Sequence, residues 1–596
     1  MRKVNFFSGK YLYLIIFLSF IFRTFYGMAV NFRHEDYIQI FLIGLKYYTT
    51  GIWPFWGPDI VWTSSQIPGA LQGILIAWPL FIFKLPEIPF IFLNLISILS
   101  LSFFAWYLLK RIKGIPPFFV WIWLFIAPWL INYSTTIINP SYVLPAAILF
   151  FIGIFEIYPF YKNKLFSDKL SFFLIGFAIV FIFQLHLSWV LLPPYIALAF
   201  YFEYKKTGFK EITVKALYFL LGLVISLVTL VPTFIKFGFV ASENVGSNIV
   251  FNSRNLYALF DILMRFMAFA GFEVRKFMGG NAQDDINFLL KNIWVSPFII
   301  FVFVTGILQT LYLIIHLFLK HKAKEWNKVR IFTVLTVIFL YISYLFSVRL
   351  VGSHTFYLFI PIVIWYSFYC WQKLFEKKFW HKFAIIFLFS GVVFHITLAL
   401  NNFDNWSLYS CRNKITQAIK EKDSRIFAYR RIHYWEKVIW KKGWKEKEEL
   451  SGNIKKLCFE NNFEYDKSAI PEKLTSKISK SGNYSCRIDS LKPISFTFNK
   501  PLRELKIKNN IDVSFYKSGK SYNEDMLVFA LEKNRKTTVL KNYPLVDYDS
   551  NNWKKTEFSY ILPSDVDTAS NLKIYVYRSK KQKNNLYIDD FKISFY

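Results

Sequence analysis

Cysteine is scarce in this sequence, which has four in 596 residues. Cys370 lies within an apolar run, whereas Cys411, Cys458 and Cys486 are widely spaced after it. A zinc site built on cysteine needs ligand pairs about two to four residues apart, so this spacing excludes one. If the C-terminal part is exported, one disulfide can form among the last three cysteines, and the sequence leaves the pairing open.

Acidic residues are also few, with 39 Asp and Glu against 71 Lys and Arg and a formal net charge of +32. In a soluble protein this balance would indicate a nucleic-acid partner. Here much of the Lys and Arg lies in short clusters between apolar runs, and no basic face is interleaved with stacking aromatics. We therefore exclude nucleic acid and expect the basic clusters to orient membrane helices.

Long polar stretches are missing from the first 400 residues, and the whole chain is 55% hydrophobic and 21% aromatic. A membrane-spanning helix needs about 20 apolar residues, and this criterion gives about eleven candidates in an α-helical polytopic membrane protein. The N-terminus carries Arg2, Lys3 and Lys10 without a cleavage site, so the first candidate is an uncleaved anchor. The candidates lie near residues 11–30, 88–109, 115–132, 139–158, 171–189, 190–203, 215–234, 294–319, 331–348, 355–372 and 382–400.

Topology follows from the basic connections, which are expected to be cytoplasmic together with the N-terminus. Two large loops, 31–87 and 235–293, and everything after residue 400 then face outward from a bacterial plasma membrane. The apolar stretch 67–85 would invert this polarity if it crossed, so we expect an interfacial helix with Trp78 and Lys84 at headgroup depth. The basic connections hold Lys110-Arg111-Lys113, Lys162-Lys164-Lys169, Lys205-Lys206-Lys210, Lys320-Lys322-Lys324-Lys328-Arg330 and Lys373-Lys377-Lys378-Lys382.

The composition changes after the membrane domain, which we assign to residues 1–400. Residues 401–456 are charged and predict a helical connector, and residues 457–596 alternate as short strands of a β-sandwich. The segments NNFE (461–464), SGNYS (481–485) and YIDDF (587–591), with Trp553, resemble carbohydrate-binding-module-like jelly rolls. A shared fold does not establish a sugar site, so a purely structural domain is the alternative.

Outward-facing acids can be compared one by one because they are so few. Only Glu35 and Asp36 lie within a few residues of the end of the first span. Carboxylates at the membrane surface are partly desolvated, which raises their proton affinity and suits a general base. The alternative is that the pair only places negative charge at the N-terminus of the next helix. The compared acids are Glu35, Asp36, Asp59, Glu87, Glu243, Asp261, Glu273, Asp284 and Asp285.

An acidic pair that opens a helix after the first span, followed by an aromatic loop with WPFWGPD (53–59), resembles GT-C superfamily glycosyltransferases. NPSYVLP (139–145) and GSHTFYLFIPIV (352–363) extend the similarity over residues 1–400. The nearest relatives are aminoarabinose transferases and protein O-mannosyltransferases of the glycosyltransferase family 39 kind. There an Asp-Glu pair supplies the catalytic base. The order here is Glu35-Asp36, and the sequence does not choose between the two.

The resemblance implies an inverting sugar transfer from a polyprenyl-phosphate donor to a glycan, lipid or protein acceptor. Nearby cations would stabilise the negative charge that develops on the departing phosphate. Alternatively Arg265, Arg275 and Lys276 hold membrane lipid headgroups, and His186 is a hydrogen-bonded packing residue. We expect no metal or other cofactor, because Asp284 and Asp285 have no further oxygen ligands in sequence. The candidates for the phosphate are Arg254, Arg265, Arg275, Lys276, Arg349, His354 and His186, the last deep in the fifth span.

Two other functions remain open at this point. A transporter or flippase for lipid-linked glycans would carry inverted repeats and mid-membrane charges, and the sequence shows no clear repeat. A non-enzymatic envelope protein that binds glycan through the jelly roll is the other alternative. Release of free polyprenyl phosphate by sugar transfer would distinguish the enzyme from the transporter and from the envelope binding protein.

Overall fold

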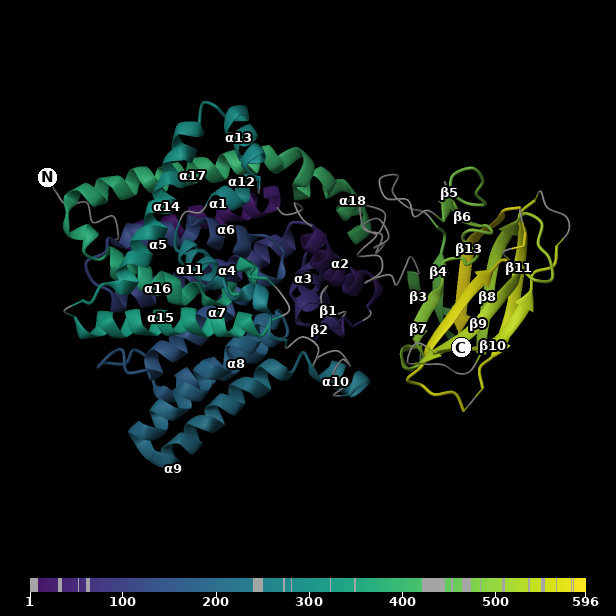
Figure 1. Cartoon of the computed structure of the whole chain (residues 1–596), viewed down its shortest axis with the longest axis horizontal. Coiled ribbons are helices and arrows are strands. Elements are labelled where there is room, and N and C mark those ends of the chain that lie inside the picture. Colours follow the sequence, from purple (N-terminus) through teal and green to yellow (C-terminus); the bar gives the residue numbers. More distant parts are fainter. Residues whose placement is uncertain are drawn as a thin grey trace. The chain divides into compact units, whose positions relative to one another are not determined.

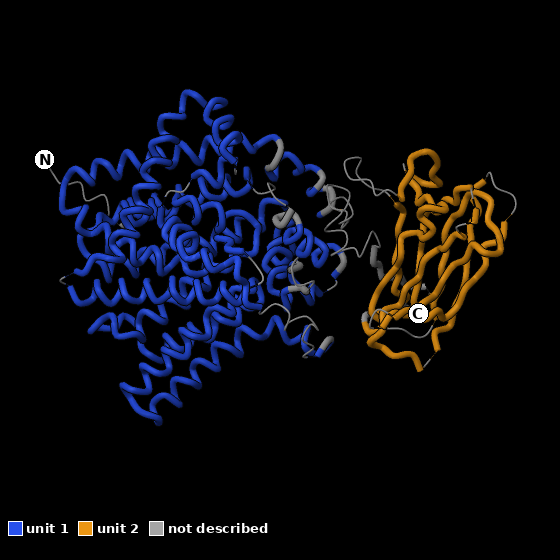
Figure 2. Tube along the Cα trace, viewed as in Figure 1, with its two compact units in different colours: residues 1–419 blue, residues 420–596 orange. Residues whose placement is uncertain are grey.

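The chain forms two compact units, residues 1–419 and 420–596, and each is described by itself (Figure 2). The first unit is helical and the second is built of strands (Figure 1). The computed structural model describes residues 9–30, 35–51, 53–60, 65–238, 250–271, 274–279, 281–321, 323–347, 350–420, 445–451, 454–463, 473–482, 484–505, 510–533, 536–547, 552–563, 565–579, 581–582 and 584–596.

The first unit is a bundle of membrane-spanning helices. Among the described residues, 6 helices are long and apolar enough to span a membrane, or 7 if the bent pair α5 (Pro117–Ile126) and α6 (Pro128–Thr135) is one span. The chain is therefore an integral membrane protein. The 6 helices are α1 (Gly9–Val30), α4 (Ile88–Arg111), α7 (Asn139–Ile157), α14 (Ser296–Phe318), α15 (Lys324–Leu345) and α17 (Lys378–Trp406).

Fewer described helices are long and apolar enough to span a membrane than the eleven or so that the sequence predicts. Two of the remaining expected segments form short helices, α8 (Asp168–Phe183) and α16 (Ile360–Trp371). The expected spans at 190–203 and 215–234 fall mainly within one element, α9 (Pro193–Leu227), whose helical dihedrals break at Gly208. A span shorter than about 18 residues needs a thinned bilayer or flanking side chains that reach the interface.

α7 is the most buried of the six helices long enough to span a membrane: 94% of its residues in the span are buried. It lies within the bundle shown in Figure 1. It contacts α4, α6, α8, α9 and α16. Between Val143 and Phe155 its side chains are apolar all round, as expected of a helix surrounded by other helices. Phe155, for example, stacks on Trp365 of α16 with ring centroids 4.1 Å apart.

α9 folds back on itself at Gly208, which has φ +78°. Lys215 in the second arm pairs with Glu203 in the first, and Phe219 packs against Phe200. The second arm also approaches α8 closely, because a Cβ at Gly176 would lie 2.0 Å from the Phe219 carbonyl oxygen. Small residues of this kind let membrane helices approach backbone to backbone.

The basic connections meet at one end of the bundle, which we call the basic end. Arg111 Nη1 donates to the Asn163 carbonyl at 2.7 Å, and Gln372 Nε2 donates to the Lys113 carbonyl at 2.8 Å. Lys328 donates to the Pro159 carbonyl. Segments distant in the sequence are therefore joined there, as the prediction from charge requires.

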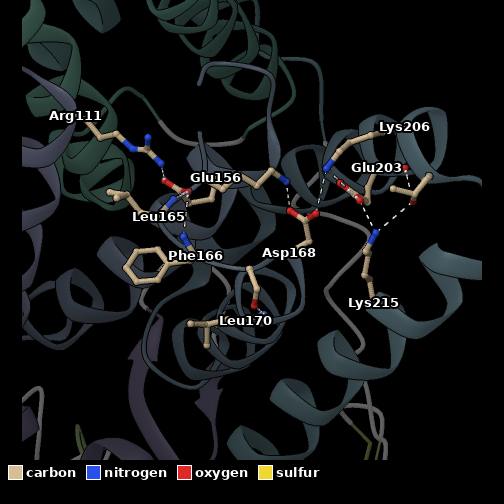
Figure 3. A network of polar contacts seen from close by, with 12 residues as sticks. Arg111, Glu156, Leu165, Phe166, Asp168, Leu170, Glu203, Lys206 and Lys215 are labelled. Atoms are coloured by element: carbon tan, nitrogen blue, oxygen red, sulfur yellow. Dashed lines mark hydrogen bonds and ion pairs between the residues drawn. The ribbon is translucent and has the colours of Figure 1, made fainter. Parts of the chain in front are cut away.

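Three carboxylates, two of them buried and the third half-buried, hold the basic end together (Figure 3). Glu156 is buried and accepts from Arg111, from the Tyr107 hydroxyl at 2.7 Å and from the Leu165 N–H at 2.7 Å. Asp168 pairs with Lys164 and Lys206, and Glu203 pairs with Lys215. The paired acids offset part of the positive charge that the connections bring together.

The first loop folds as α2 (Glu35–Thr50), the hairpin β1 (Trp56–Ile60) and β2 (Ser65–Pro68), and α3 (Leu71–Ile82). At 12 residues α3 is about 18 Å long, too short to cross a hydrocarbon core of about 30 Å. It packs on α2 and α4 and leaves Trp78 exposed. The expectation that the stretch 67–85 does not cross agrees with this length, and its interfacial position stays a prediction.

The end opposite the basic end, called the distal end, carries the remaining helices. Successive spans run in opposite directions. Helices α1, α5, α15 and α17 therefore end at the distal end, and helices α4, α7 and α14 begin there. The connecting elements at this end are α6, α10 (Val231–Phe237), α11 (Ala258–Ala268), α12 (Arg275–Met278), α13 (Ala282–Lys291) and α18 (Leu408–Lys420).

The second unit is a β-sandwich of two antiparallel sheets with one apolar core. The first sheet has the order β10 (Lys536–Pro544), β9 (Met526–Lys533), β12 (Asn571–Tyr577) and β7 (Phe498–Pro501). The second has β11 (Lys554–Ile561), β8 (Asn510–Ser518), β13 (Leu586–Phe595), β4 (Ile454–Asn461) and β3 (Lys445–Ser451), with β5 (Leu474–Thr475) and β6 (Ser485–Ile488) beside β13. The alternating burial along β8 matches the period of two expected for these strands.

Two sequence expectations about this region were wrong. Residues 445–451, taken as part of a helical connector, form the edge strand β3, because pairing with β4 extends the sheet. None of the four cysteines forms a disulfide in the described part of the chain. Cys458 lies opposite Ser594 and Cys486 opposite Ile588 on β13, and six residues of strand separate them by about 20 Å, far beyond disulfide reach.

Candidate functional site at the distal end

The acidic pair occupies the first turn of α2. Glu35 and Asp36 are the first two residues of that helix, which follows soon after α1 ends at Val30. Their side-chain positions lie outside the described part of the chain. The helix start places both residues near the end of a membrane span, as the sequence predicts.

α6 lies directly against the end of α1. The Tyr26 hydroxyl donates to Asn132 Oδ1 at 2.7 Å, and a Cβ at Gly27 would lie 2.2 Å from the Thr135 carbonyl oxygen. Gly27 therefore lets the two helices meet backbone to backbone just before the acidic pair.

The opposite side of α6 is aromatic and meets a cation. Lys276 Nζ lies 4.3 Å from the ring centroid of Trp129, and Phe277 packs against the same ring at 5.5 Å. Tyr133 packs against Tyr357 with centroids 5.4 Å apart. α6 thus connects the end of α1 with the predicted cation Lys276, whose ammonium group is attracted by the face of the Trp129 ring.

Two other predicted cations are in ion pairs. Arg275 Nε lies 2.9 Å from Asp285 Oδ2, and Arg265 Nε lies 2.8 Å from Asp261 Oδ1. Arg265 Nη1 also donates to Ser353 Oγ at 3.3 Å, next to the exposed His354. Both arginines keep exposed guanidinium surface through which an anion could bind.

The remaining candidates lie apart or outside the described residues. Arg254 is exposed on a short 3₁₀ turn, Ser253–Asn255. Arg349 falls among the residues that the structure does not describe.

The placement of His186 deep in the fifth span was wrong. α8 ends at Phe183, and His186 follows it as the N-cap of the 3₁₀ turn Leu187–Leu191. Its Nδ1 accepts from the Ser188 N–H at 3.1 Å and lies 2.8 Å from Ser188 Oγ. Gln184 is the C-cap of α8, and its side chain donates to the Ser226 carbonyl and accepts from the Thr229 hydroxyl.

The two acids considered for a cation have other partners. Asp285 pairs with Arg275, and Asp284 lies at the N-terminus of α13, where its N–H donates to Asn281 Oδ1 at 2.8 Å. Among the described residues, no group of three His, Cys, Asp or Glu side chains could hold a metal ion.

Sequence reasoning missed a buried polar cluster between the spans. Arg23 lies inside α1 and His395 inside α17, and both are fully buried. The available signal was a charged residue in the middle of an apolar run, which is costly unless it is paired or functional. Scanning runs by average hydropathy hides such a residue.

Comparisons with known proteins give weak structural likenesses. No family model matches the chain, and no curated protein matches it. The arabinosyltransferase EmbB from Mycobacterium smegmatis is similar over 100% of this chain and 66% of its own, with 9% identity and a TM-score of 0.35. ArnT from Cupriavidus metallidurans, solved bound to undecaprenyl phosphate, is similar over 70% of this chain and 78% of its own, with 13% identity and a TM-score of 0.35.

A third likeness concerns the C-terminal part. The CBM22-1 xylan-binding domain of Xyn10C from Paenibacillus barcinonensis is similar over 26% of this chain and 86% of its own, with 16% identity and a TM-score of 0.15. The chain spans about two thirds of the length of EmbB, 66%.

Proposed function

We propose that the protein is an integral-membrane inverting glycosyltransferase that moves a sugar from a polyprenyl-phosphate donor to an extracytoplasmic acceptor. The observation that carries this proposal is the acidic pair in the first turn of α2, at the same end of the bundle as Lys276, Arg275 and Arg265. General base and phosphate-stabilising cations are the two groups that this transfer needs.

In the proposed reaction, Glu35 or Asp36 takes the proton of an acceptor hydroxyl as its oxygen attacks the anomeric carbon. The bond from that carbon to the phosphate oxygen breaks, and polyprenyl phosphate leaves with the electron pair. The configuration at the anomeric carbon inverts. Lys276 and the exposed faces of Arg275 and Arg265 stabilise the negative charge that develops on the leaving phosphate.

The acidic pair lies at a depth in the membrane that suits both the lipid-linked donor and the acceptor. The pair follows a span within a few residues, so a polyprenyl chain lying in the outer leaflet brings its phosphate to the same level. The basic end is proposed to be cytoplasmic, because positive connections are retained on that side. The distal end then faces outward, where the acceptor hydroxyl belongs to a glycan, a lipid or a protein.

The test replaces each acid without changing its size, as Glu35→Gln, Asp36→Asn and the pair together. We expect at least one single variant to lose transfer by about 10² fold or more, the usual contribution of a general base. Release of polyprenyl phosphate from a radiolabelled polyprenyl-phosphate sugar is measured in membranes. Glu87→Gln is the matched control, since Glu87 lies at the same end but is paired with Arg412.

Full activity of both single variants and the double variant would reject the assignment of the base. Movement of the labelled lipid across vesicles without bond cleavage would instead identify a transporter. Glycan binding without either activity would identify an envelope binding protein.

A further inference from the structure

The break between α5 and α6 exposes backbone carbonyls inside the bundle. The two helices bend by 52° at Ala127, whose ψ of 132° is not helical, and Pro128 has no N–H to continue the ladder. The last carbonyls of α5 are left without helical partners. In a membrane interior such groups must be satisfied by other parts of the protein.

Two side chains from other helices satisfy these carbonyls. Arg23 Nη1 of α1 donates to the Phe125 carbonyl at 2.6 Å, and His395 Nε2 of α17 lies 2.7 Å from the Ile126 carbonyl. A carbonyl only accepts, so His395 carries its proton on Nε2. The carbonyls at the break are therefore held by side chains from two other helices, α1 and α17.

Arg23 also binds α4 and α6. Its Nε donates to Asn94 Oδ1 of α4 at 3.2 Å, and its Nη2 donates to Ser134 Oγ of α6. Asn94 is oriented for this by donating its own amide to Thr24 Oγ1 at 2.6 Å. One guanidinium thus ties together α1, α4, α5 and α6.

The partners of Arg23 are all uncharged within the described residues. Burying a cation without an acid costs several kcal/mol, and carbonyls can be capped by neutral donors at lower cost. A guanidinium differs in that its rigid fork fixes several acceptors at once. The geometry that it fixes here is the angle between α5 and α6.

That angle sets the position of the predicted cation. α6 carries Trp129, over which Lys276 lies, and Ser134, which Arg23 holds. We infer that Arg23 is a positioning residue: through Ser134 and the α5–α6 break it places Trp129 so that Lys276 meets the donor phosphate. This inference rests on the proposed function, which assigns Lys276 to that phosphate.

The first experiment measures binding of undecaprenyl phosphate to the purified full-length protein in detergent, with undecaprenol as the uncharged comparison. Ser134→Ala removes one acceptor of Arg23 with little change in volume, and Arg23→Lys keeps the charge but loses the fork. We expect each to weaken binding of the phosphate by about tenfold and to leave undecaprenol unaffected. Lys215→Met, which breaks a buried pair in α9, is the control and should leave both unchanged.

A double-mutant cycle separates positioning from general destabilisation. In a Lys276→Ala background, Ser134→Ala should cause no further loss, because its effect acts through Lys276. Additive losses would overturn the inference while leaving the proposed function intact. Equal affinity of the wild type for undecaprenyl phosphate and undecaprenol would overturn both.

Hydrogen–deuterium exchange gives a readout that needs no ligand. Amides of residues 129–136 should exchange faster in both Arg23→Lys and Ser134→Ala, while those of α9 should not change. Unchanged exchange in α6 would overturn the positioning role, even if the variants bind poorly.

Discussion

Asp589 illustrates how a single buried carboxyl can make part of the molecule sensitive to pH. It lies in β13 and accepts from the N–H groups of Lys480 at 2.7 Å and Asp590 at 2.8 Å. Burial raises its pKa from 3.8 to about 6, more than these hydrogen bonds lower it, and the neighbouring Asp590 adds to the rise. The folded sandwich therefore binds a proton more tightly than the unfolded chain does.

This predicts that Asp589 lowers the stability of the sandwich as pH rises from about 4 to about 6, because folding then has to bury a charge. Asp589→Asn should flatten that slope in thermal unfolding of a fragment covering residues 445–596, which contains the apolar core. Asp567→Asn is the contrasting control. Lys533 lowers the pKa of Asp567, so its contribution is lost as pH falls. Equal slopes for Asp589→Asn and the wild type would contradict the prediction.

At the residue scale, the acidic pair could be located from sequence because it follows an apolar run of span length. The clamp around Arg23 could not, because its partners Asn94, Phe125 and Ser134 come from three other helices. Only the folded bundle brings them together. His186 was misplaced for a related reason, since the apolar run continues past the point where α8 ends.

At the scale of helices, α8 and the second arm of α9 are held by close backbone approach. A Cβ at Gly222 would lie 2.3 Å from the Phe173 carbonyl oxygen, and one at Gly176 would meet Phe219. Packing of this kind depends on the absence of side chains rather than on strong polar bonds. The packing of these helices could not be predicted from apolar runs, because it depends on where side chains are absent.

Gly222→Leu is therefore expected to destabilise the bundle by about 1–3 kcal/mol through overpacking. Thermal unfolding of the full-length protein in detergent measures the loss. Val224→Leu is the matched control, because Val224 is exposed on the same arm and a larger side chain meets no helix there. Equal melting temperatures for the two variants would show that the arms are not closely packed.

At the scale of the whole molecule, the helical unit and the sandwich have separate interiors. Residues 420–596 contain an apolar core of their own, built from strands of both sheets. The two-part organisation was predictable from the change in composition after residue 400. The exact start of the sandwich was not, because the charged strand β3 has the composition of a solvent-exposed helix.

Deletion of residues 445–596 is expected to leave basal transfer within about twofold of the full chain, since the proposed base and cations all lie in the first unit. The rate of transfer is measured for both proteins with a short soluble acceptor and with a polymeric glycan. The difference between the two acceptors gives the contribution of the sandwich. Loss of activity toward both acceptors, with the helical unit still folded, would place part of the reaction in the sandwich.

The gathering of basic connections at one end has an electrical consequence. A cell with a negative interior holds each positive charge on that side with about 2.3 kcal/mol per 100 mV. In the orientation proposed above, with the basic end cytoplasmic, Lys328, Lys206 and Arg111 would all have to move against that voltage if the bundle inverted. The resting potential of the cell would then favour this orientation over the inverted one.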